Sequence, residues 1–137
     1  MTVTNQEVGL AVKRLQWRHH RESNRSLAPL GLSLVQWDVL RHLHREPTSS
    51  LHRLAELTFQ TDQAMGELAR RMIDRGLLTR DAGPGRIVRH ALTEEGERVR
   101  IAGGDAVDGV LEETVGRLTA DERATLLRLL TTAAARV

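Results

Sequence analysis

The pattern of apolar positions predicts a chain made mostly of helices. Apolar residues recur at steps of three and four, as they do along one face of an α-helix. Residues suited to cap a helix N-terminus, among them Ser33, Thr61 and Thr93, stand where such patterns begin. Helices are expected over residues 5–25, 34–46, 51–57, 62–75, 94–115 and 120–134.

Two short strand-like runs interrupt the helical pattern. Residues 77–80 and 87–92 are separated by Ala82-Gly83-Pro84-Gly85, a composition typical of a hairpin tip. Gly76 stands where a left-handed residue ends the preceding helix. The sequence therefore predicts a mainly α fold with a small β-hairpin wing.

The first and last helices carry more apolar surface than one small domain can bury. Val8, Ala11, Val12 and Leu15 form one stripe of the first helix, whereas Leu10 and Trp17 fall on another face. The last helix has Leu126, Leu127, Leu129, Leu130 and Ala134. We therefore expect an obligate homodimer. Gly103-Gly104, inside the long helix, predicts a kink or a close backbone approach.

Charge is segregated along the chain. The formal net charge of the 137 residues is only +2. Residues 13–100 nevertheless carry 16 Lys and Arg against 11 Asp and Glu, whereas residues 101–137 carry 4 against 6. An anionic partner is expected to bind the middle of the chain.

That middle segment has the order of a winged helix-turn-helix. A short helix, a three-residue turn and a second helix precede the hairpin, and an α-helix fits the major groove of DNA. Between Arg70 and His90 there are six arginines against two aspartates. Phosphate neutralisation by such residues supplies most non-specific DNA affinity.

Four short motifs in this order resemble the MarR family of bacterial transcription regulators. They are Leu32-Ser33-Leu34-Val35-Gln36-Trp37-Asp38-Val39-Leu40, Leu54-Ala55, Gly76-Leu77-Leu78-Thr79-Arg80 and Leu92-Thr93-Glu94-Glu95-Gly96. The resemblance implies a homodimer that binds a pseudo-palindromic operator. Residues 5–30 and 93–137 would form a helical dimerisation body, and residues 31–92 the winged helix-turn-helix embedded in it, within one domain spanning 1–137.

The wing departs from the family pattern. Members of the family usually have Asp-x-Arg near the tip, with the arginine in the minor groove and the aspartate bracing it. Counting back from Leu92-Thr93, Arg86 occupies the arginine position and Pro84 the aspartate position. The brace is missing, and Arg89 is a second candidate for the same task.

The outward face of residues 62–75 is the expected reading surface. Gln63 is suited to adenine, Glu67 to the amino group of cytosine, and Arg70 to guanine or phosphate. The alternative is an ordinary solvated helix face. The candidate DNA-binding residues are Thr61, Asp62, Gln63, Gly66, Glu67, Arg70, Arg71, Arg75, Arg86 and Arg89.

A ligand site is implied by the resemblance, because the family places a cleft for small aromatic acids where the first two helices meet the winged domain. Trp17, His20 and Trp37 are the candidates for binding a small aromatic or anionic effector. The alternative is that both indoles belong to the core. The six histidines lack metal-ligand spacing, so no metal or cofactor is expected, although a zinc-responsive regulator stays an alternative.

Several function classes are excluded or disfavoured. The chain has no cysteine, so it has no disulfide or thiol redox sensor. We see no secretory signal, no membrane span and no catalytic motif, which favours a cytoplasmic protein that is not an enzyme. The expected function is a repressor released from its operator by a ligand. The alternatives are a winged protein-interaction module without operator binding and a DNA-binding protein indifferent to sequence.

Overall fold

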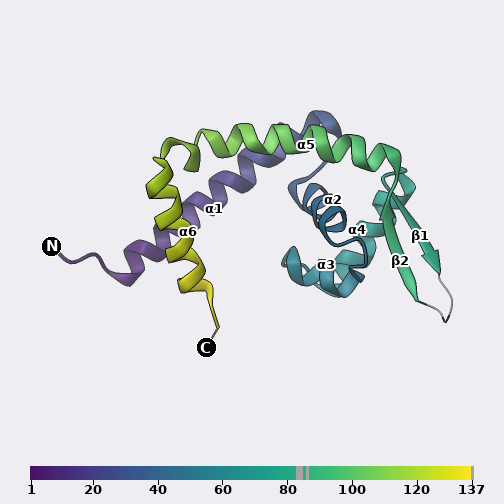
Figure 1. Cartoon of the computed structure of the whole chain (residues 1–137), viewed down its shortest axis with the longest axis horizontal. Helices are drawn as coiled ribbons and strands as arrows, with labels where there is room; N and C mark the ends of the chain where they lie inside the picture. The colour runs from purple at the N-terminus through teal and green to yellow at the C-terminus, as the bar shows by residue number, and fades with distance from the viewer. Residues whose placement is uncertain (83–84, 86, 137) are drawn as a thin grey trace.

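The computed structural model describes residues 1–82, 85 and 87–136. Figure 1 shows α5 as a long rod that joins a helical body, formed with α1 and α6, to a winged domain that contains α2, α3, α4 and the hairpin. The helices are α1 (Asn5–Leu27), α2 (Leu34–Arg45), α3 (Leu51–Leu57), α4 (Asp62–Asp74), α5 (Glu94–Glu112) and α6 (Ala120–Ala134). Short 3-10 turns at Ala28–Leu30 and Val115–Arg117 follow α1 and α5.

The helices begin at side-chain caps that the sequence predicts. Ser33 forms a capping box with Gln36 at the start of α2, and Thr61 accepts a hydrogen bond from the Ala64 amide at the start of α4. The α3 cap is Ser50, whose hydroxyl accepts from the Arg53 amide. Local sequence therefore determines where these elements start.

The wing is a two-stranded antiparallel sheet of β1 (Leu78–Ala82) and β2 (Val88–Leu92). The strands start one residue later than the sequence predicts. Leu77 is excluded because its amide donates to Met72 and its carbonyl accepts from Thr93. This residue closes α4 and anchors the start of α5, so it takes no part in the ladder.

The prediction that α5 reaches Val115 is wrong. The helix ends at Glu112, and Val115 opens the short 3-10 turn that follows. The backbone of Thr114 is not helical, with φ of −115° and ψ of −93°, and this conformation ends the helix before Val115. The Thr114 hydroxyl lies within hydrogen-bonding distance of the carbonyls of Val110 and Leu111 at the end of the helix.

The core lies inside the winged domain and beneath α5. Leu40 and Leu43 of α2, Met65 and Met72 of α4, and Leu54 of α3 are almost fully buried. α5 adds Val99 and Val107 to the same cluster. The face of α4 that carries Met65 and Met72, opposite the predicted outward face, therefore holds this helix in the domain.

Gly103 permits a close approach of α5 to α2. An added Cβ at this glycine would lie 2.5 Å from Cδ1 of Trp37. The Trp37 indole donates to the carbonyl of Arg100 at 3.0 Å. The expected close backbone approach is confirmed, and it is the joint between α5 and the winged domain.

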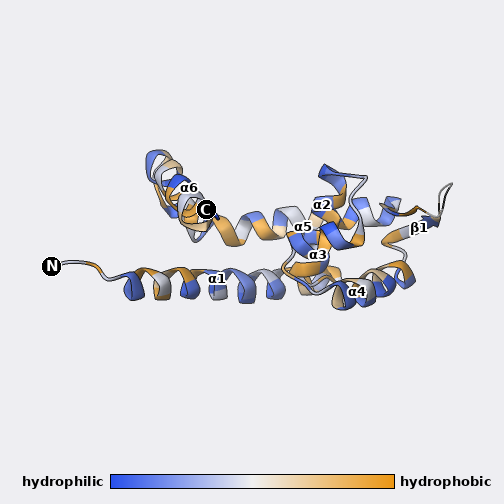
Figure 2. Cartoon of the chain, turned by 90° about the horizontal axis from the view of Figure 1, so that it is seen from below, coloured by the Kyte–Doolittle hydropathy of each residue, from blue (hydrophilic) through white to orange (hydrophobic). Residues whose placement is uncertain are grey.

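The ends of the chain are apolar and exposed. α6 has no buried residue, and Leu127, Leu129 and Leu130 are 40–68% exposed. On α1, the apolar residues face the side on which α6 lies (Figure 2). Among the described residues no helix is both long and apolar enough to cross a bilayer.

Candidate nucleic-acid interface and effector groove

The turn between α3 and α4 fixes how α4 is presented. The hydroxyl of Thr58 donates to the Leu54 carbonyl at 2.6 Å, and the Gln60 amide donates to Ala55 at 2.9 Å. Phe59 between them adopts the left-handed conformation, with φ of 59°. These bonds close the three-residue turn of a helix-turn-helix.

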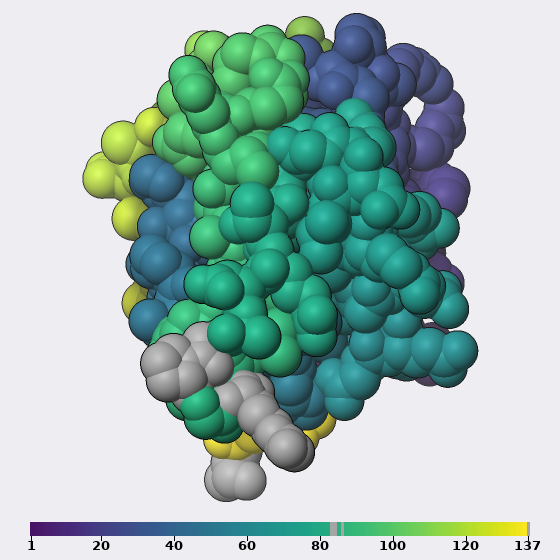
Figure 3. All heavy atoms as spheres, turned by 90° about the vertical axis from the view of Figure 1, so that its right-hand side faces the viewer, coloured from purple at the N-terminus to yellow at the C-terminus, as the bar shows by residue number. Residues whose placement is uncertain are grey.

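The outward face of α4 is polar and exposed. Gln63, Glu67, Arg70 and Arg71 are all exposed, and Gly66 is half-buried among them. Neither arginine forms an ion pair within the part of the chain that the structure describes. Figure 3 views the molecule from this end, where residues near 60–80 cover much of the surface. The guanidinium groups are free to meet an anionic partner.

The head of α4 carries a histidine–carboxylate hydrogen bond that sequence reasoning missed. His52 of α3 donates through Nδ1 to Oδ1 of Asp62, the first residue of α4, over 2.9 Å. Glu56 lies 3.7 Å from the other ring nitrogen. The Asp62 hydrogen bond, and then the charges of Asp62 and Glu56, raise the pKa of His52.

Arg75 is engaged within the protein. Its guanidinium donates to the carbonyl of Gly31, a residue with φ of 71° in the turn before α2. The sequence places Arg75 among the DNA-binding candidates, whereas the structure uses it to tie the end of α4 to that turn. The two residues are 44 positions apart, so no local pattern signals the contact.

The wing presents further arginines. Arg89 is exposed on β2 and stands opposite Asp81, and Arg80 stands opposite His90. His90 is buried, and this burial, followed by the charge of Arg80, lowers its pKa. Arg86, the expected minor-groove residue, and Pro84 beside it lie outside the described residues.

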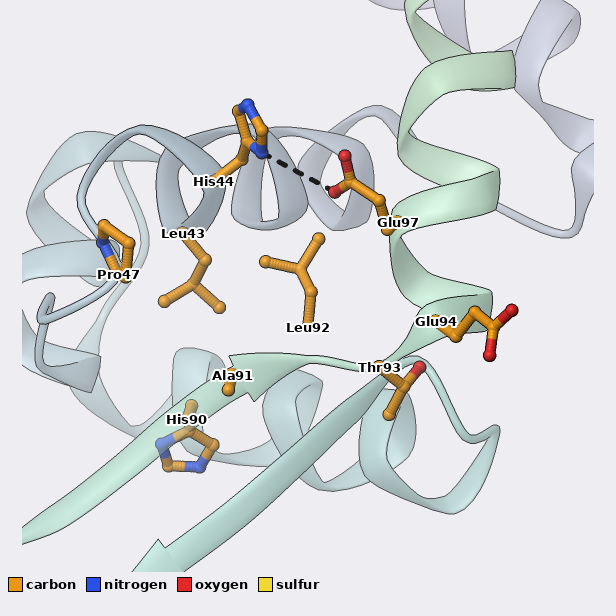
Figure 4. A pocket seen from close by; sticks show the side chains of 9 residues that line it. All are labelled: Leu43, His44, Pro47, His90, Ala91, Leu92, Thr93, Glu94 and Glu97. Carbon is orange, nitrogen blue, oxygen red and sulfur yellow. Dashed lines mark ion pairs between the residues drawn. The ribbon is translucent and has the colours of Figure 1, made fainter.

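The base of the wing packs on α2 and α5 around a cavity of about 400 Å³ (Figure 4). Leu43 of α2 and Leu92 of β2 point toward one another there. His44 lies 3.6 Å from Glu97 and links α2 to α5. Hydrogen bonds from Arg100 are the main cause that lowers the pKa of Glu97. The wing is thus joined to both helices that carry the domain.

A larger groove of about 820 Å³ lies between α1 and α6. Its lining is mostly apolar and includes the stripe that the sequence predicts for α1. The lining residues are Val8, Ala11, Val12, Leu15, Gln16, His19, His20, Leu34, Val115, Leu126, Leu129, Leu130 and Ala133.

The three candidate ligand residues are not brought together in that groove. His20 lines it, and the Trp17 ring stacks on His20 with centroids 5.8 Å apart while remaining 56% exposed. Trp37 packs against Gly103 and lies 5.2 Å beneath the Arg41 guanidinium, within the joint of α2 and α5. Trp37 thus belongs to the packing of the domain and Trp17 to its surface.

The six histidines are distributed over α1, α2, α3 and β2. No three His, Asp or Glu side chains among residues 1–82, 85 and 87–136 are grouped so as to hold a metal ion. His19 instead lies 2.6 Å from the hydroxyl of Thr114, and so joins α1 to the end of α5.

Comparison with known proteins identifies the family. Residues 30–87 match the MarR family model. The transcriptional repressor Rv2887 of Mycobacterium tuberculosis H37Rv is 32% identical over 111 residues, which cover 80% of each chain. This chain belongs to the MarR family. It is a family of transcription regulators, as the four sequence motifs indicate.

Solved structures of MarR proteins share the fold. Rv2887 in complex with p-aminosalicylic acid has a TM-score of 0.77 at 28% identity and covers 93% of this chain and 98% of its own. Rv2887 in complex with DNA has a TM-score of 0.74 at 26% identity, with 93% and 97% covered. A MarR-family regulator from Rhodococcus sp. RHA1 has a TM-score of 0.87 at 20% identity, with both chains fully covered.

Proposed function

We propose that this MarR protein is an operator-binding repressor that reads DNA with α4 and the wing, and that a small aromatic acid releases it. The observation that carries the proposal is the outward face of α4. Arg70 and Arg71 are exposed there beside Gln63, on a helix whose opposite face is buried. The relative Rv2887, which has the same fold, has been solved in complex with DNA.

Each part of this surface has a separate task. The Gln63 amide can pair with adenine, and the Glu67 carboxylate can accept from cytosine, since both stand on the exposed face near the start of α4. Thr61, Asp62 and Gly66 lie at the same end of the helix. Arg70 and Arg71 lie further along α4, where they meet phosphates, and Arg89 extends this basic surface onto the wing.

Selection of bound duplexes from a random pool tests the proposal. Enrichment of a pseudo-palindromic sequence is the expected result. Titration of the selected duplex at several salt concentrations then compares wild type with Arg70→Ala and Arg71→Ala. Loss of one phosphate contact per protomer should lower the salt slope by about 1 per site, or about 2 for a dimer.

The matched control is Arg14→Ala, which removes one positive charge from an exposed position on α1. This variant should retain the wild-type salt slope. A pool from which no sequence is enriched would contradict operator binding. Equal slopes for the α4 variants and the Arg14 control would show instead that α4 does not contact the phosphates.

The protein is proposed to act as a homodimer through α1 and α6. The last helix has no buried residue in a single chain, although Leu127 and Leu130 project from it. A second copy would bury these side chains and much of the groove between α1 and α6. Leu130→Glu places a carboxylate on that surface and is expected to give monomers in sedimentation at micromolar concentration.

The effector is proposed to bind where the groove meets α2. His20 and Gln16 line it beside Leu34 at that end, which combines polar groups with apolar walls. Rv2887, which has the same fold, has been solved in complex with p-aminosalicylic acid, a small aromatic acid. Calorimetric titration with salicylate should give binding to wild type and weaker binding to His20→Ala. Unchanged binding would place the effector elsewhere.

A further inference from the structure

His52 lies between two carboxylates at the head of α4. Its Nδ1 is 2.9 Å from Oδ1 of Asp62, and its Nε2 is 3.7 Å from Oε1 of Glu56. A neutral imidazole carries one N–H, whereas the imidazolium carries two. Only the protonated ring can therefore direct a donor toward both carboxylates. All three side chains are more than half exposed, so the ring exchanges protons freely with solvent.

The surrounding charges favour the protonated form. Asp62 faces His52 from α4 and Glu56 faces it from α3, and these are the charged groups that act on its titration among the described residues. Arg53, the cation that follows it on α3, lies 3.9 Å from Glu46 and is paired there. The pKa of the His52 imidazole therefore lies above its ordinary value.

The position of this cluster matters because Asp62 is the first residue of the helix proposed to enter the major groove. With His52 neutral, Asp62 and Glu56 present two negative charges to an approaching phosphate backbone. With His52 protonated, the cluster carries a single negative charge, and Oδ1 of Asp62 is held by the imidazolium. Its second carboxylate oxygen is left to accept from the amino group of cytosine.

We propose that His52 is a proton-dependent positioning residue of the recognition helix, whose protonation strengthens and orients operator binding through Asp62. This inference rests on the proposed function, since it needs α4 to contact DNA. Linkage makes the effect reciprocal, so a bound duplex must also raise the proton affinity of His52.

The test measures affinity for the selected duplex by fluorescence anisotropy between pH 6 and pH 8 at constant ionic strength. Wild type should bind more weakly as the pH rises. If binding raises the His52 pKa by one unit, the pH-dependent change in affinity is at most roughly tenfold per protomer. His52→Lys stays positively charged throughout this range and His52→Gln stays neutral, so both should give flat profiles, with the glutamine variant weaker at pH 6. Asp62→Asn should flatten the profile as well.

The matched control is His44→Gln. His44 is also an exposed histidine beside a carboxylate, but it pairs with Glu97 across α2 and α5, away from α4. This variant should keep the wild-type profile. NMR titration of the imidazole in wild type, with and without the duplex, should show the His52 pKa rising on binding.

The outcomes distinguish loss of operator binding from loss of its pH dependence. Failure of wild type to bind any selected duplex at any pH would overturn the proposed function together with this inference. Binding by wild type with a flat pH profile, or retention of the wild-type profile by His52→Gln, would overturn the inference alone.

Discussion

Replacing Gly103 by alanine should destabilise the joint between α5 and the winged domain. The new methyl group would lie 2.5 Å from Cδ1 and 3.0 Å from Nε1 of Trp37, and 3.1 Å from Cδ2 of Leu27. The indole has little freedom to move, because its N–H is bonded to the Arg100 carbonyl and the Arg41 guanidinium covers its face. Leu27 is fully buried.

The magnitude follows from two opposing effects. Overpacking of this kind costs about 1–3 kcal/mol, and displacement of the indole would weaken a hydrogen bond with a net value of about 1 kcal/mol. Alanine is favoured over glycine inside a helix by about 1 kcal/mol. The net loss in the free energy of unfolding should therefore be about 1–3 kcal/mol.

Gly104→Ala is the matched control. At this neighbouring glycine the nearest atom to an added Cβ is Cζ2 of Trp37 at 4.0 Å, which is an ordinary contact. Only the helix preference then remains, so this variant should gain about 0.5–1 kcal/mol. Urea unfolding followed by circular dichroism at one fixed protein concentration measures both, since dimerisation makes apparent stability depend on concentration.

Equal stability of the two alanine variants would contradict a clash at Gly103. An unchanged loss of stability for Gly103→Ala in a Trp37→Leu background would show that the clash does not involve the indole. A double-mutant cycle between the two positions measures this coupling directly.

Three further outcomes are expected. Phe59→Asn should stabilise the protein by about 1 kcal/mol in urea unfolding, because asparagine tolerates the left-handed backbone better and the phenyl ring that it replaces is 94% exposed. An equal or lower stability would contradict this. Arg75→Ala should lower the free energy of unfolding by about 1 kcal/mol, because it removes the hydrogen bond to the Gly31 carbonyl, and should leave the salt slope of duplex binding unchanged. A reduced salt slope would show that Arg75 contacts DNA. Because burial lowers the pKa of His90, the unfolded state binds more protons than the folded state, so stability should be full above about pH 6.5 and fall as the pH drops through the folded-state pKa. Thermal unfolding at pH 7.5 and pH 5 should show that His90→Gln loses less stability in acid than wild type.

Elements governed by local chemistry could be predicted from the sequence. Ser33, Thr61 and Thr93 cap the helices because a hydroxyl two or three residues ahead of a free amide satisfies it without help from the rest of the fold. The exposed polar face of α4 could be predicted for a similar reason, since a period of 3.6 residues assigns each residue to one face of the helix. The stop of α5 before Val115 depends on the non-helical backbone of Thr114, which no periodicity reports.

Contacts between distant segments could not be predicted in this way. Arg75 reaches Gly31 only because the end of α4 packs beside the turn before α2. His52 and Glu56 are one helical turn apart, so the sequence predicts their proximity. The contact of His52 with Asp62 depends instead on how the turn at Phe59 orients α4 relative to α3. The separation of Trp17 from Trp37 likewise depends on which face of each helix the tertiary packing covers.

α5 contacts α1, α2 and the β2 strand of the wing. At its C-terminal end Thr114 meets His19 of α1, and at its centre Gly103 meets Trp37 of α2. At its N-terminal end the Thr93 hydroxyl donates to the Gly76 carbonyl, beside the hairpin. In the proposed function, a ligand that shifts α1 against α5 would carry α2 and the wing with it, because α5 contacts all three. Release of DNA would then need no change inside α4, since a tilt of α5 would alter the spacing of the two α4 helices in a dimer.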